Sequence, residues 1–252
     1  LSLGCMLAVS LDVDTLKKYS IDNITVAAIN SPNRCTLSGS KDDIDTLIQS
    51  LRADAVPYCL VAANHAYHSV AVESIQQEFS DYLSHIQTNR PSIPFISNLT
   101  GQWLPDNEAM SSHYWSRQMR KTVLFSRGIE TLINGQFSIF VELGLGHHLS
   151  TFVKQHGCAV ECYAPHLSAY NSGVTEAYLK VLGALWETGI FIDWAAFNNS
   201  HPASRIPLPT YPFEKKRYWV EETGKKAVTQ QEVSCSCVFL LLVYPGAERQ
   251  LQ

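Results

Sequence analysis

Two short apolar runs meet at a turn in the stretch Ile24-Thr25-Val26-Ala27-Ala28-Ile29-Asn30-Ser31-Pro32-Asn33-Arg34-Cys35-Thr36-Leu37. The β-branched residues on both sides favour strands. Each residue of the central Asn-Ser-Pro-Asn favours a turn. The stretch therefore predicts a β-hairpin.

The segments around this hairpin mirror one another. We expect a helix before the hairpin, at residues 12–19, and one after it, at residues 41–52. We expect a strand before the first helix, at residues 6–9, and one after the second helix, at residues 56–61. Ser10 or Asp12 is a candidate N-cap for the first helix, and Ser40 for the second. Residues 5–61 thus predict a ferredoxin-like β-α-β-β-α-β subdomain.

Strands and helices alternate again in residues 62–197. Helices are expected at 70–86, 111–118, 127–134, 147–155 and 173–188, and strands at 94–98, 138–143 and 159–163. Such alternation favours a parallel or mixed sheet covered on both faces. The fold class is therefore α/β, with two subdomains.

The character of the sequence changes after residue 197. Residues 198–222 carry prolines and aromatics between Ile206 and Trp219, which favours an extended segment along a folded surface. Residues 223–252 have no pattern that predicts a fold, and we expect this tail to be disordered.

Composition narrows the classes of function. The chain has 252 residues, 46% of them hydrophobic and 17% charged, which is typical of a globular protein. A net charge of -4 argues against nucleic acid as a partner. The seven scattered cysteines favour a reducing, cytoplasmic location. The C-terminal apolar run at 238–244 is too short to span a bilayer, so no membrane is expected.

The sharpest candidate for chemistry is the turn Asn64-His65-Ala66-Tyr67-His68-Ser69, between an expected strand and an expected helix. A neutral His68 could take a proton from a hydroxyl and return it to a leaving thiol. For an arbitrary histidine, however, a purely structural role is more common than a catalytic one. His65 and His68 could also share a metal, but no third ligand is placed by the sequence.

Two further features favour less specific interpretations. Gly144-Leu145-Gly146-His147 opens a helix, where an anion could bind, although a tight turn for close packing is the favoured explanation of the glycines. No G-x-S-x-G nucleophile motif occurs in the 252 residues. A histidine base would therefore need a nucleophile from elsewhere.

Several motifs in order give the chain a family resemblance. It resembles the C-terminal part of the acyltransferase domain of type I polyketide synthases, and is similar to malonyl-CoA:acyl carrier protein transacylases and the matching domain of animal fatty acid synthase. The motifs that carry the resemblance are Gly4 to Val9, Ala28 to Pro32, Leu37 to Gly39, His65 to Ser69, Ile93 to Asn98, Tyr114-Trp115, Phe140 to Gly146 and the post-acyltransferase linker motif Leu208 to Trp219.

The resemblance implies a fold and a mechanism. The family fold is an α/β-hydrolase-like subdomain, of which residues 62–197 would be the C-terminal part, with an inserted ferredoxin-like subdomain. A serine in a G-H-S-x-G elbow takes an acyl group from coenzyme A and passes it to the phosphopantetheine thiol of an acyl carrier protein. The partners implied are that carrier protein and neighbouring domains such as a ketosynthase; this chain itself would bind no cofactor.

The resemblance also assigns residues. His68 matches the catalytic histidine, the last residue of the family's H-A-F-H tetrad, present here as His65-Ala66-Tyr67-His68. H-A-F-H accompanies malonyl selection, because a bulky aromatic fills the space that an α-methyl group needs. Tyr67 keeps that bulk. Asn30 matches a position that lines the cleft, although a structural role in its turn is equally compatible with the sequence.

The family's serine, and the arginine that grips the malonyl carboxylate, match no residue here; the resemblance places both before Leu1. We therefore expect a fragment that is inactive alone. Arg117 and Arg120 are not assigned as substitutes for that arginine. The alternatives are a non-catalytic docking piece of a multidomain synthase, a fatty acid synthase malonyl/acetyl transferase, and an esterase-like hydrolase.

Overall fold

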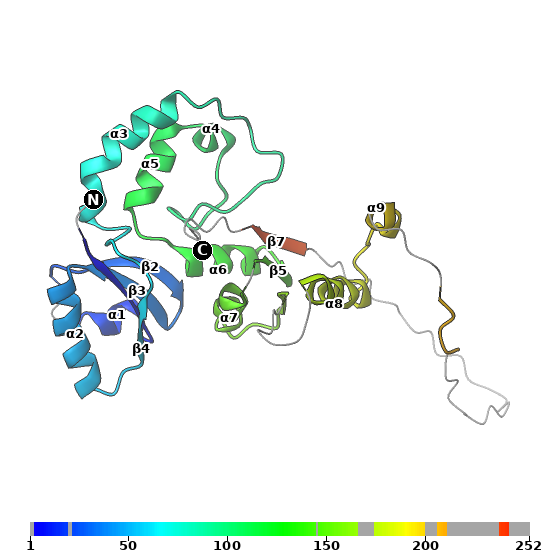
Figure 1. Cartoon of the computed structure of the whole chain (residues 1–252), viewed down its shortest axis with the longest axis horizontal. Helices are drawn as coiled ribbons and strands as arrows, with labels where there is room; N and C mark the ends of the chain where they lie inside the picture. The colour runs from blue at the N-terminus through cyan, green and yellow to red at the C-terminus, as the bar shows by residue number, and fades with distance from the viewer. Residues whose placement is uncertain are drawn as a thin grey trace, which may run out of the picture.

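The computed structural model describes residues 3–19, 22–144, 146–165, 174–199, 206–210 and 237–241 (Figure 1). Their helices and strands are β1 (Cys5–Val9), α1 (Val13–Leu16), β2 (Thr25–Ser31), β3 (Arg34–Gly39), α2 (Lys41–Ala53), β4 (Tyr58–Val61), the 3-10 turn η1 (Val70–Val72), α3 (Glu73–Ser84), α4 (Asp106–Ala109), α5 (Ser112–Arg120), α6 (Phe125–Asn134), β5 (Ile139–Leu143), α7 (His148–Lys154), β6 (Glu161–Tyr163), α8 (Val174–Glu187), α9 (Trp194–Asn199) and β7 (Cys237–Leu241).

The first four strands form an antiparallel sheet in the order β2-β3-β1-β4. The element order β-α-β-β-α-β is the one that the sequence predicts. Leucine and isoleucine side chains of α1 and α2, such as Leu16 and Ile44, are fully buried against sheet residues such as Leu7 and Leu37. Both helices therefore cover the same face of this sheet (Figure 1).

Hydrogen bonds at the helix starts explain where α1 and α2 begin. Of the two candidate caps for α1, Asp12 fills the role, since its carboxylate accepts from the backbone of Asp14 and Thr15. Ser40 caps α2 through the backbone N–H of Asp43, at 3.1 Å, as expected. The helix over residues 12–19 is shorter than predicted, because only Val13–Leu16 are helical.

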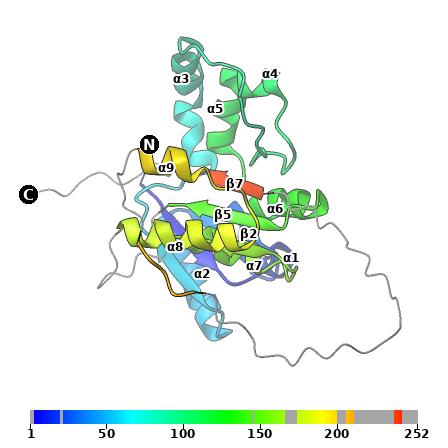
Figure 2. The same cartoon turned by 90° about the vertical axis from the view of Figure 1, so that its right-hand side faces the viewer.

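The second sheet is parallel, in the order β6-β5-β7. Side chains of β5 alternate between its two faces. Phe140 packs with α6 and α7 on one face, while Ile139 and Val141 pack against Leu185 of α8 on the other. Figure 2 shows α8 across this sheet. Helices on both faces are what the alternation of strands and helices predicts.

A third group of elements lies between the two sheets in the order of the chain. Helix α3 packs beside α5, and the loop between them turns through α4 over a small core of Leu104, Ala109 and Tyr114. This lobe stands apart from both sheets in Figures 1 and 2. It begins directly after the His68 turn and ends at Lys121.

Two expectations for residues 62–197 are wrong in detail. The predicted strand over 94–98 is not a strand, and Ile96 forms only an isolated bridge to Trp103. Pro94 lacks a donor, and the chain folds back on itself, with Ser97 N–H bonded to Gln102. The predicted helix over 70–86 is divided into η1 and α3 and ends at Ser84.

The C-terminal expectations fall largely outside the described residues. Residues 211–236 and 242–252 lie outside them, and with them most of the proline–aromatic segment and of the expected disordered tail. Within that tail, the strand β7 over Cys237–Leu241 pairs with β5, a pairing that no pattern in the sequence predicts. In the described part of the chain, no helix is long and apolar enough to cross a bilayer.

Candidate active site

The candidate site is the turn that leads from β4 into η1. Ala66 in this turn is buried, and Gly4 lies against it: a Cβ on Gly4 would come within 2.8 Å of the Ala66 Cβ and backbone nitrogen. Gly4 N–H also donates to the Asn64 carbonyl at 3.1 Å. A glycine at position 4 therefore lets the histidine turn lie directly on the start of β1.

His68 has an unusual backbone conformation. Its φ angle is +55°, in the left-handed region that L-residues with a Cβ visit rarely. Ser69 fixes the next step of the chain, since its hydroxyl donates to the Ala66 carbonyl at 2.6 Å and accepts from Ala71 N–H. Ser69 and Val72 are buried. The turn is thus held on both sides of the strained residue.

The ring of His68 is held by a backbone carbonyl. Its Nδ1 lies 2.9 Å from the carbonyl oxygen of Lys121. Because a carbonyl can only accept, Nδ1 must carry the hydrogen. Nε2 is then the basic nitrogen when the ring is neutral, which is the arrangement that a general base needs.

The surroundings favour the neutral ring. Burial lowers the pKa of His68 below its usual 6.5, and hydrogen bonds to the backbone of Lys121 and Gln118 oppose that shift only in part. Burial disfavours the charged imidazolium. His68 is therefore available as a base near neutral pH.

The segment that carries Lys121 is anchored on the antiparallel sheet. Val123 N–H donates to the Ala27 carbonyl at 2.9 Å, and its carbonyl accepts from Ile29 N–H at 2.8 Å. Thr122 Oγ1 donates to the Val26 carbonyl. Residues 121–124 thus extend the edge of β2, and the hydrogen bond from His68 ends on this anchored segment.

The other predicted site residues lie in different settings. The rings of His65 and Tyr67 meet edge to face, with centroids 5.9 Å apart, and Tyr67 is 41% exposed beside His68. Asn30 lies on β2, where its amide donates to Thr36 Oγ1 across the hairpin at 2.9 Å. Of the two interpretations of Asn30, this contact favours the structural one.

Sequence reasoning missed the contacts behind His68. The Lys121 carbonyl has no signature in the sequence, because every residue has a carbonyl. Arg120, next to it, forms an ion pair with Glu73, with its Nε 2.7 Å from Glu73 Oε1. The sequence signals for this ion pair were an acidic residue in the first turn of one helix and a basic residue in the last turn of another.

The N-terminus of α7 is already occupied. The carboxylate of Glu142, a buried residue of β5, accepts from Ser150 N–H at 2.9 Å and from Leu149 N–H at 3.3 Å. The anion that such a helix start favours is therefore part of the chain itself. A Cβ on Gly144 would meet nothing within 4 Å, so close packing does not explain that glycine.

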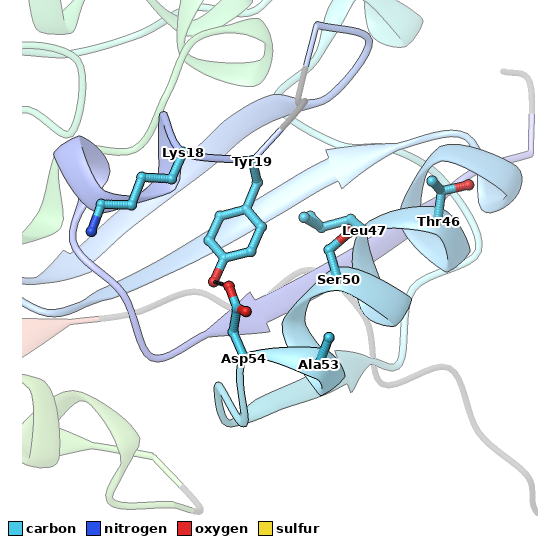
Figure 3. A pocket seen from close by; sticks show the side chains of 7 residues that line it. All are labelled: Lys18, Tyr19, Thr46, Leu47, Ser50, Ala53 and Asp54. Atoms are coloured by element: carbon cyan, nitrogen blue, oxygen red, sulfur yellow. Dashed lines mark hydrogen bonds between the residues drawn. The ribbon is translucent and has the colours of Figure 1, made fainter.

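The His68 turn carries no metal cluster in the described part of the chain. Among the residues that the structure describes, no three His, Cys, Asp or Glu side chains gather as metal ligands would. A hollow of about 460 Å³ lies by α1 and α2, where the Tyr19 hydroxyl donates to Asp54 at 2.8 Å (Figure 3). His68 does not line it.

Known proteins that resemble this chain indicate one family. The family model described as "Acyl transferase domain" matches residues 2–165. A phenolphthiocerol/phthiocerol polyketide synthase of Mycobacterium tuberculosis is 30% identical over 230 residues, which are 86% of this chain and 15% of that protein. The chain therefore spans a small part of that relative.

Solved structures resemble the chain over about half their length. The acyl transferase domain of SpnD, in complex with 2-(pent-4-yn-1-yl)malonyl, is 28% identical with a TM-score of 0.70, covering 74% of this chain and 47% of that one. The acyl transferase domain of ZmaA is 31% identical with a TM-score of 0.69, covering 83% and 50%.

Proposed function

This chain belongs to the acyl transferase domain family of modular type I polyketide synthases, and on that premise we propose that it supplies the general base of a malonyl transferase. The observation that carries the proposal is the hydrogen bond from His68 Nδ1 to the Lys121 carbonyl, which leaves Nε2 as the proton acceptor. Burial that keeps the ring neutral supports it further.

In the proposed reaction, His68 Nε2 takes the hydroxyl proton of a serine as its oxygen attacks the thioester carbonyl of malonyl-CoA. The proton then goes from Nε2 to the departing coenzyme A sulfur, which leaves an acylated serine. In the second half, Nε2 takes the proton of the carrier protein's phosphopantetheine thiol while its sulfur attacks the ester. That proton returns to the serine oxygen, so atoms and charge balance over the cycle.

The nucleophilic serine is assigned to a part of the acyltransferase domain beyond these 252 residues, which contain no G-x-S-x-G motif. Without such a serine the covalent route is closed, so the chain alone is expected to transfer no malonyl group. The arginine for the malonyl carboxylate is likewise assigned elsewhere, because the family resemblance places it before Leu1; Arg120 is itself paired with Glu73.

The remaining parts of the proposal concern fold and partners. The antiparallel sheet would be the inserted ferredoxin-like subdomain, and β5, β6 and their helices part of the α/β-hydrolase-like one. The exposed Tyr67 beside His68 would narrow the pocket toward malonyl. The acyl carrier protein and neighbouring synthase domains would be the partners, in the cytoplasm.

The test is malonyl transfer by the full-length polypeptide that carries this chain. Radiolabelled malonyl-CoA and a carrier protein bearing phosphopantetheine are supplied, and the wild type is compared with His68→Ala. A loss of about 10²-fold or more in kcat/KM is expected when the base is removed. An unchanged rate would overturn the proposal, and release of free malonate without carrier protein would favour a hydrolase. A G-H-S-x-G coding sequence in frame before Leu1 would supply the missing serine.

A further inference from the structure

One ion pair lies immediately behind His68, and no step of the proposed reaction uses it. Arg120 Nε donates to Glu73 Oε1 at 2.7 Å. Exposed ion pairs contribute little to stability. This one differs, because the Arg120 side chain is only 16% exposed while that of Glu73 is 56% exposed. Burial of one partner fixes the geometry of the pair more firmly than on an open surface.

The pair joins the same two chain segments as the hydrogen bond to His68. Glu73 begins α3, five residues after His68, and Arg120 ends α5, directly before Lys121. The chain from His68 to Glu73, the ion pair, the bond from Arg120 to Lys121 and the contact from the Lys121 carbonyl to His68 Nδ1 form a closed ring. Because Arg120 is bonded directly to Lys121, a shift in the position of the ion pair also shifts the Lys121 carbonyl.

The orientation of the two helices favours these charges. Ser116 Oγ donates to the Gln76 carbonyl at 3.1 Å, one turn along from the ion pair in both helices. Helices α3 and α5 therefore run antiparallel, and the N-terminus of α3 meets the C-terminus of α5. A carboxylate is favourable at the first of these ends and a guanidinium at the second. The charges could not be exchanged without opposing both helix dipoles.

We propose that Glu73 and Arg120 are positioning residues for His68. Their ion pair holds the Lys121 carbonyl where it accepts the Nδ1 hydrogen and so fixes the tautomer with Nε2 as the base. The inference rests on the proposed role of His68. Neither Glu73 nor Arg120 is assigned a contact with substrate; both act through the carbonyl of Lys121.

The test uses Glu73→Gln, which keeps the size of the side chain, Arg120→Gln, which shortens the side chain and removes its charge, and the charge-retaining Arg120→Lys. Glu176→Gln is the matched control, since it breaks an ion pair with Lys180 on α8, outside the ring of contacts. The first measurement is the ¹⁵N NMR spectrum of the His68 imidazole in the 252-residue chain, which distinguishes the two tautomers without any need for activity.

In the wild type and the control, we expect His68 to carry its hydrogen on Nδ1. In Glu73→Gln and Arg120→Gln, a second population with the hydrogen on Nε2 should grow. In the full-length polypeptide, kcat for malonyl transfer should fall about 10-fold in these variants, with KM for malonyl-CoA changing less. Arg120→Lys should recover part of the loss. A merely structural pair would lower stability without moving the tautomer.

The possible failures can be told apart. If Glu73→Gln folds as the wild type and leaves both the tautomer and kcat unchanged, the positioning role is wrong, whatever the role of His68. If His68→Ala leaves transfer unchanged, the proposed function fails first. Should Arg120→Gln not fold, Glu73→Gln decides the question, because Glu73 is largely exposed and its replacement buries no new polar group.

Discussion

At the scale of the residue, His68 combines a left-handed backbone with a fixed tautomer. A non-glycine residue at a φ angle of +55° costs on the order of 1 kcal/mol, although histidine tolerates the region better than most residues. Ser69 and the Lys121 carbonyl hold it there. Strain that persists because its surroundings fix it is typical of a functional position, and here it aims the ring at the anchored segment 121–124.

The lowered pKa of His68 predicts a pH dependence of both activity and stability. The ring must be neutral to accept a proton, so kcat/KM for malonyl transfer should fall only at a pH below 6.5. Well above pH 6.5 the ring is neutral in both the folded and the unfolded chain, so His68 adds nothing there to the pH dependence of stability. As the pH falls from 6.5 toward the folded pKa, the unfolded chain takes up a proton that the folded chain does not, and stability declines.

Acid-side unfolding of the wild type, compared with His68→Gln, measures this contribution. The variant should lose the part of the decline that starts at pH 6.5. A rate profile whose acidic limb lies above pH 6.5 would contradict the lowered pKa.

At the scale of the element, α7 begins where Glu142 meets it. The helix is short, and its first amides find their acceptor on the neighbouring strand β5. We expect Glu142→Gln to lower the free energy of unfolding by about 1 kcal/mol, since the amide keeps one acceptor oxygen but loses the charge that the helix start favours.

Urea unfolding of the chain measures this cost, with Glu130→Gln on the exposed side of α6 as control. The control should change the unfolding midpoint little. Equal midpoints for Glu142→Gln and the wild type would show that the contact contributes nothing.

Local signals in the sequence predict many of the helices and strands but miss some features at this scale. The hairpin, the Ser40 cap and the buried β5 follow from turn residues, capping geometry and apolar runs. The segment 94–98 looks like a strand locally, but its partner is the loop that follows it rather than a sheet. The contacts of His68 with Lys121, and of Glu73 with Arg120, span more than forty residues. No local pattern encodes such contacts; the family resemblance singled out His68 without them.

At the scale of the whole molecule, residues 121–124 connect the parts. They lie on the edge of β2, accept the hydrogen bond of His68 and lead into α6, which packs on the parallel sheet. A second junction lies nearby, where the Ser31 hydroxyl at the end of β2 donates to Gln155 Oε1, just after α7, at 2.5 Å. The position of His68, the proposed general base, therefore depends on how the two sheets are joined.

Replacing Val123 by proline tests this dependence directly. Proline removes the N–H that donates to the Ala27 carbonyl, and Ala27 is fully buried, so the carbonyl is left without that partner. We expect the free energy of unfolding to fall by about 1–3 kcal/mol. The amide of Ile29 should also lose protection from hydrogen exchange, because its acceptor is the carbonyl of residue 123.

Val123→Ala is the matched control, since it shortens the side chain but keeps both backbone hydrogen bonds. It should leave the exchange of Ile29 close to that of the wild type. If the segment serves to place His68, the Nδ1 tautomer should weaken in Val123→Pro and persist in Val123→Ala. The opposite result would be that both variants keep the protection of the Ile29 amide and the Nδ1 tautomer of His68. His68 would then be positioned within the α3–α5 lobe alone, independently of the antiparallel sheet.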